Sequence, residues 1–137
     1  MLFRSNSVGI NGAKLNSFLK ENLYETQIKE IDPDLVVFDL IANDLETGEF
    51  NYDQVEKDLK SCIAKIKASN SEASIIVVGM QDCYIEGRDV INAGLYSSYL
   101  KKFAAFNNVA FYDYYPVSGG VRSMKKWSKN GLSAKDM

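Results

Sequence analysis

Residues 31–44, IDPDLVVFDLIAND, decide the fold that this chain is expected to adopt. Pro33 fixes its own φ and disfavours helix in the residue before it, so a preceding helix should end here. Residues 35–38 are a continuous apolar run, typical of a strand buried on both faces of a parallel sheet. Asn43 and Asp44 follow just past the carboxyl end of that strand. Ligands bind at this edge of open α/β sheets, so the stretch also predicts the position of a site.

The same alternation of helix and strand signals continues on both sides of this stretch. Helices are predicted over residues 13–31, 51–69 and 91–106, a short helix around Met124 and Trp127, and further strands over residues 1–7, 75–78 and 109–113. Asn51 is expected to cap the second helix, and Gly131 the last one. The third helix is expected to bury an apolar stripe made of Ile91, Leu95, Tyr99, Leu100, Phe103 and Phe106. Strands that alternate with helices of this length predict a parallel sheet.

The overall composition fits one globular domain and excludes several classes of protein. The chain has 137 residues, enough for a single domain with a proper core, and we treat residues 1–137 as that domain. Sixteen basic and 18 acidic residues give no electrostatic signature of nucleic-acid binding. No apolar run has the length of a membrane span, and the first residues do not form a secretion signal, so the compartment stays open. Cys62 and Cys83 match no metal or redox spacing and are expected to be buried free thiols.

Two segments match motifs of a known family, and a third resembles the approach to another motif, all in the family's order. Residues 9–13, GINGA, resemble the second conserved block of the SGNH (GDSL-type) hydrolases, and residues 41–44, IAND, resemble the third block, usually Gly-x-Asn-Asp. Residues 124–136 resemble the approach to the final Asp-x-x-His block. The resemblance implies a three-layer α/β/α, flavodoxin-like parallel sheet that lacks its first strand. It also implies that Gly12 and Asn43 donate to an oxyanion and that Asp136 orients a catalytic histidine.

The match has three departures, and they concern the chemistry directly. The family's Gly-Asp-Ser block is absent, and the chain contains no histidine. Ile41 stands where the third block usually has glycine. We therefore expect a fragment of a serine esterase that is inactive alone. We expect the parent enzyme to act on carboxylic esters, such as acetyl groups on carbohydrate or cell-envelope polymers, without a metal or organic cofactor.

Each candidate site residue also has a structural interpretation. Gly12 could serve only a turn, Asn43 with Asp44 could form a helix cap or Asx-turn, and Asp136 could be a surface carboxylate. Gln81 and Asp82 follow the strand at residues 75–78 and are candidates for substrate binding, with a plain polar loop as the alternative. The conjunction of three motifs in the family's order favours the catalytic interpretation.

Two other functions are compatible with parts of the sequence. A non-catalytic binding module could keep the fold without the serine and histidine. A phosphoacceptor receiver domain could use Asp39, because residues 33–40 resemble a receiver's central strand, but the accompanying acidic pair and lysine are missing. Loss of the first strand further predicts marginal stability or oligomerisation of the isolated chain.

Overall fold

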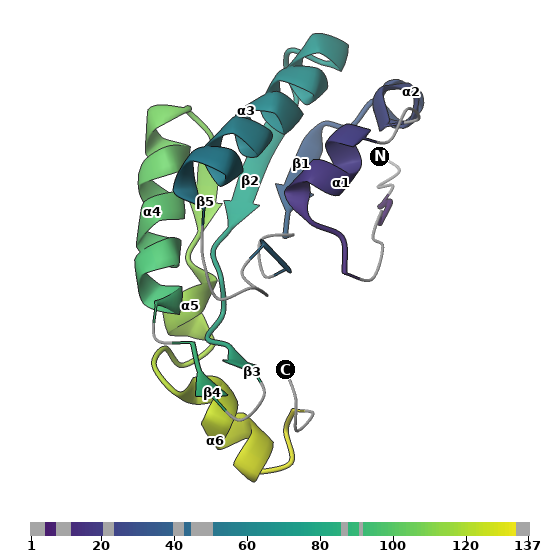
Figure 1. Cartoon of the computed structure of the whole chain (residues 1–137). Coiled ribbons are helices and arrows are strands. Elements are labelled where there is room, and N and C mark those ends of the chain that lie inside the picture. Colours follow the sequence, from purple (N-terminus) through teal and green to yellow (C-terminus); the bar gives the residue numbers. More distant parts are fainter. Residues whose placement is uncertain are drawn as a thin grey trace.

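The computed structural model describes residues 5–7, 12–20, 24–39, 43–44, 51–85, 88–90 and 92–133. Its main feature is a parallel sheet of three strands in the order β1-β2-β5 (Figure 1). The strands are β1 (Leu35–Phe38), β2 (Ser74–Val78) and β5 (Ala110–Tyr112). In register, Val37 of β1 pairs with Ile76 of β2, which pairs with Ala110 of β5. The predicted parallel sheet is confirmed.

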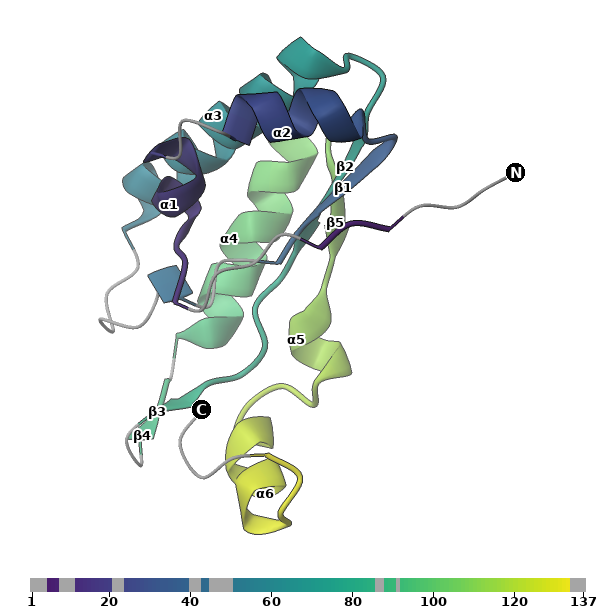
Figure 2. The same cartoon turned by 90° about the vertical axis from the view of Figure 1, so that its right-hand side faces the viewer.

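Four helices lie together on one side of this sheet, as Figure 2 shows. They are α1 (Leu15–Lys20), α2 (Tyr24–Ile31), α3 (Tyr52–Ser69) and α4 (Ala93–Phe106). Helix α3 begins as predicted, because the Asn51 side chain accepts a hydrogen bond of 3.0 Å from the Gln54 N–H. The single helix expected over residues 13–31 is instead two helices, with residues 21–23 outside the described part.

Below the carboxyl edge of the sheet lie a small hairpin and two short helices (Figure 1). The antiparallel hairpin pairs β3 (Tyr84–Ile85) with β4 (Arg88–Asp89), and the helices are α5 (Tyr114–Val117) and α6 (Ser123–Lys129). Asp89 links the hairpin to α6, because its carboxylate lies 3.2 Å from Arg122 Nε and 4.0 Å from Lys125 Nζ. The sequence pattern did not predict this hairpin. The strand expected over residues 1–7 is not seen at residues 5–7, and residues 1–4 are outside the described part.

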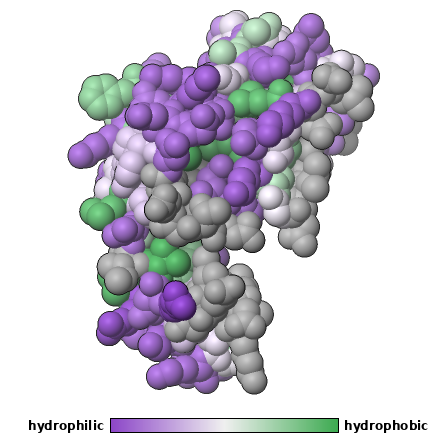
Figure 3. All heavy atoms as spheres, viewed as in Figure 1, coloured by the Kyte–Doolittle hydropathy of each residue, from purple (hydrophilic) through white to green (hydrophobic). Residues whose placement is uncertain are grey.

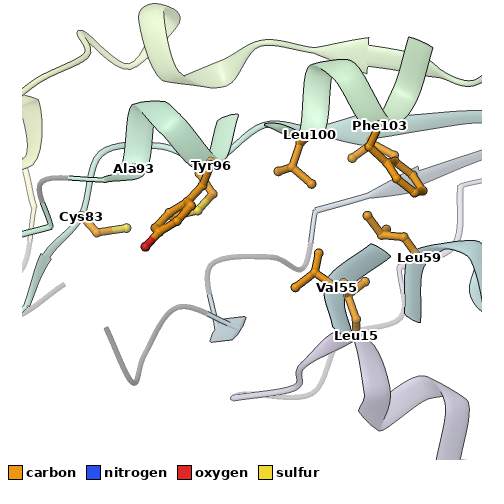
Figure 4. Packing of buried hydrophobic residues seen from close by; sticks show 10 residues of the cluster. Leu15, Val55, Leu59, Cys83, Ala93, Tyr96, Leu100 and Phe103 are labelled. Atoms are coloured by element: carbon orange, nitrogen blue, oxygen red, sulfur yellow. The ribbon is translucent and has the colours of Figure 1, made fainter. Parts of the chain in front are cut away.

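The hydrophobic core fills the space between the sheet and helices α1, α3 and α4. Figure 4 shows part of it, with Leu15, Leu59 and Leu100 from three different helices pointing toward one another. Their side chains are fully buried. A second cluster, around Phe38 and Ile66, continues the core toward α2. Cys62 and Cys83 are buried and free, as predicted, and burial raises the pKa of their thiols to about 12 and about 11.

One face of β1 differs from the sequence prediction. Leu35 and Val37 were expected to be buried, but they are 51% and 53% exposed. The alternation of the strand places them opposite Phe38, which is buried under the helices. The described helices α1 to α4 cover only the Phe38 side. The prediction of burial on both faces is therefore wrong for the described part of the chain.

The buried face of α4 matches the predicted stripe only in part. Leu100 and Phe103 are buried as expected. Leu95 and Phe106 are 63% and 89% exposed, whereas small residues such as Ser97 and Ala104 are buried. Small side chains let the helix approach the sheet closely, and Ser97 satisfies its hydroxyl by donating to Asp113 Oδ1 at 3.1 Å. Large apolar residues identified only part of this face, because small residues occupy the rest of it. Ile91, also assigned to the stripe, lies outside the described residues.

The face of the molecule shown in Figure 3 is mostly hydrophilic over its described residues, with hydrophobic residues in small separate areas. Among the described helices, none combines the length and the apolar character needed to cross a bilayer.

Candidate active site

The candidate site lies where the chain has left the carboxyl end of β1. Asn43 and Asp44 form a short helical turn there, and both are half-buried. Their side chains reach back to the segment that begins α1, with hydrogen bonds to Ala13 and Leu15. The apolar run of β1 and the polar residues after it predicted this position.

Asn43 connects the end of β1 to the glycine turn. Its side-chain amide Nδ2 donates a hydrogen bond of 2.9 Å to the backbone carbonyl of Ala13, the residue after Gly12. Gly12 has a φ of +75°, a left-handed conformation that side chains rarely adopt, and a Cβ there would meet no atom of the described residues within 4 Å. The backbone conformation alone therefore favours a glycine at this position. Because an amide carries two N–H groups, the bond to Ala13 leaves Asn43 a second donor.

Asp44 contacts the same segment two residues further on. Its Oδ2 accepts a hydrogen bond of 3.2 Å from the N–H of Leu15, the first residue of α1. The first N–H groups of a helix have no partner inside the helix, so Asp44 acts as a cap supplied from 29 positions away. The structural interpretation of this residue as a helix cap is thus correct for Asp44.

The Asp44 carboxyl lies in a setting that opposes its ionisation. Burial raises its pKa, and the hydrogen bond from Leu15 and the charge of Lys14 counteract only part of that effect. The charge of Asp58 on α3 raises the pKa of Asp44 further.

Gln81 and Asp82 follow β2 as predicted, but the Asp82 side chain has a structural partner. Asp82 is 3% exposed, and its Oδ2 accepts a hydrogen bond of 3.2 Å from the N–H of Met124 in α6. Burial raises the pKa of this carboxyl, against the lowering effect of backbone N–H groups. Asp82 therefore anchors the start of α6. The substrate-binding role of Gln81 and Asp82 stays a prediction.

Asp136 lies outside the described residues, so its position relative to Asn43 stays a prediction. The helix that precedes it ends as the sequence indicated. Gly131 has a φ of +68°, and the Leu132 N–H donates to the Trp127 carbonyl at 2.9 Å. This bond, together with that from the Gly131 N–H to the Ser128 carbonyl, forms a Schellman motif.

No group of three or more histidine, cysteine, aspartate or glutamate residues in the described ranges could hold a metal ion.

A parallel α/β sheet with an asparagine and a glycine turn joined at its carboxyl edge is the arrangement expected of an SGNH-type hydrolase fold. The sequence profile of the GDSL-like lipase/acylhydrolase family matches residues 2–133, so the chain belongs to that family. The resemblance stated from the sequence is confirmed. No curated protein sequence matches the chain.

A solved structure with the same fold is described as a peptidoglycan O-acetylesterase in action. It superposes with a TM-score of 0.78 at 20% sequence identity, over 91% of this chain and 37% of that one. This likeness confirms the predicted fold class. The chain thus spans little more than a third of the length of that structural neighbour.

A helix cap was among the interpretations of Asp44, but nothing in the sequence indicated that its partner is Leu15. Local capping signals lie within three or four residues of a helix start, and here the local signal is Ser17, whose Oγ accepts from the Lys14 N–H at 3.1 Å. The contact between Asp44 and Leu15 depends on how β1 and α1 pack, so no local pattern could indicate it.

Proposed function

We propose that the full-length gene product hydrolyses carboxylic esters with a serine nucleophile, and that Gly12 and Asn43 bind the oxyanion. The observation that carries this proposal is the hydrogen bond from Asn43 Nδ2 to the Ala13 carbonyl. It joins the asparagine that follows β1 to the glycine turn, and the family membership supplies the chemical class.

In the proposed reaction a serine hydroxyl attacks the ester carbonyl carbon while a histidine takes the hydroxyl proton. The carbonyl oxygen becomes an oxyanion, which accepts hydrogen bonds from the Gly12 N–H and from the second amide N–H of Asn43. The alcohol leaves with the proton from the histidine, and water then releases the acid from the serine by the same sequence of steps. Asp136 would orient the histidine.

The histidine of this reaction is not among the 137 residues, and neither is a Gly-Asp-Ser block. The proposal therefore applies to the full-length gene product, and the 137-residue chain is expected to be inactive on its own. We assign substrate selection to residues 81–89, because they follow the carboxyl end of β2 and include the β3–β4 hairpin.

For the substrate we propose an O-acetyl group on a carbohydrate or cell-envelope polymer. The support is the likeness in fold to a structure described as a peptidoglycan O-acetylesterase.

The test is acetate release by the full-length gene product from p-nitrophenyl acetate, acetylated xylan and O-acetylated peptidoglycan. We expect hydrolysis that an organophosphate directed at serine abolishes, with the 137-residue chain as the inactive control. Absence of hydrolysis on all three substrates would contradict the proposal and favour a non-catalytic binding module.

A further inference from the structure

Two consecutive side chains hold the segment between the glycine turn and α1. Asn43 donates to the Ala13 carbonyl at 2.9 Å, and Asp44 accepts from the Leu15 N–H at 3.2 Å. The two bonds have opposite polarity and act on alternate residues of the segment. Neither can be replaced by the other, because one needs a donor and the other an acceptor.

Burial of its side chains also holds this segment in place. Ala13 is 5% exposed and Leu15 is fully buried in the main core cluster. The Lys14 N–H has a local acceptor in Ser17, but the Leu15 N–H has Asp44 as its acceptor. Loss of the Asp44 oxygen would leave a buried backbone donor without that partner, and the segment would shift or expose it to water.

We infer that Asp44 is a positioning residue of the oxyanion site, which fixes the turn at Gly12 relative to Asn43. The inference rests on the proposed function. Asp44 itself does not touch the substrate. It sets the distance between the Gly12 N–H and the Asn43 amide. Oxyanion donors are effective only within a narrow range of positions.

The test compares Asp44→Ala and Asp44→Asn in the full-length gene product. The alanine removes the acceptor, whereas the asparagine keeps one oxygen that can accept from Leu15. We expect Asp44→Ala to lower kcat about ten- to a hundredfold with little change in KM, because misplaced donors weaken the transition state more than the bound substrate. Asp44→Asn should restore most of kcat.

Asn51→Ala is the matched control. Asn51 accepts from the Gln54 N–H at the start of α3, so its loss removes a helix cap of the same kind away from the glycine turn. We expect its kcat to stay close to that of the unmodified protein. Thermal melts of all three variants check that each is folded.

Three results would overturn the inference: an unchanged kcat in Asp44→Ala, an asparagine variant as impaired as the alanine, or an equal loss in Asn51→Ala. If the unmodified protein hydrolysed no ester, that result would instead contradict the proposed function, and the inference about Asp44 would fall with it. Amide hydrogen exchange at Leu15 reports the contact independently of activity, and it should become faster in Asp44→Ala but not in Asn51→Ala.

Discussion

At the scale of single residues, Asn43 and Asp44 make different contacts with the same segment of the chain. The amide of Asn43 is held by the Ala13 carbonyl, and the carboxylate of Asp44 holds the start of α1. The sequence predicted a role for Asn43 through its motif. It left Asp44 open between a cap and an Asx-turn, and the structure shows a cap for a helix that precedes it in the chain.

Gly12 and Gly131 allow a matched test of backbone conformation. Both have positive φ, and a Cβ at either position would meet no atom of the described part of the chain within 4 Å. Gly12→Ala and Gly131→Ala should each lower the free energy of unfolding by about 1–2 kcal/mol, because the cost is that of a left-handed alanine. Urea unfolding of each variant beside the unmodified chain measures this loss.

We expect kcat to differ between the two glycine variants. In the full-length gene product Gly12→Ala should lower kcat, and Gly131→Ala should leave it nearly unchanged. Equal losses of kcat would contradict the assignment of Gly12 to the oxyanion site.

At the scale of elements, α6 depends on a carboxylate that follows β2. Asp82 is buried and accepts from the Met124 N–H, and burial raises its pKa above the value of an unfolded chain. The native state therefore keeps the proton at a pH where the unfolded state has released it. Stability contributed by this group is present at low pH and falls as the pH rises through the raised pKa.

The variant Asp82→Asn removes this titration and keeps an oxygen that can accept from Met124. The melting temperature of the variant minus that of the unmodified chain should increase as the pH is raised from about 4 to about 7. Melts followed by circular dichroism at several pH values measure this difference. A difference that is constant or decreases over this range would contradict the raised pKa.

The elements also show what the sequence could predict. Helix α3 begins at its local cap, Asn51, and this start was predicted correctly. The buried face of α4 was predicted only in part, because close packing on the sheet selects small residues such as Ser97 over the exposed Phe106. Local signals indicated elements and their ends, while the faces and the Asp44 contact depend on packing between distant segments.

At the scale of the whole molecule, the sheet has one face that the described helices α1 to α4 do not cover. Leu35 and Val37 are half exposed there, although their pattern is that of a buried strand. Apolar surface that stays in contact with water contributes nothing to the hydrophobic stabilisation of the isolated chain.

We therefore expect the 137-residue chain to melt at low temperature or to associate. Circular dichroism combined with sedimentation at several concentrations measures both properties. A cooperative, high-temperature melt of a monomer would contradict the expectation.

The central claim is that Asn43 donates to the oxyanion of an ester hydrolase, and its most direct test is kcat of Asn43→Ala in the full-length gene product. We predict a decrease of roughly 10²–10³-fold, as expected for one lost oxyanion donor, while Asn51→Ala stays near the unmodified value. An unchanged kcat in Asn43→Ala would contradict the claim.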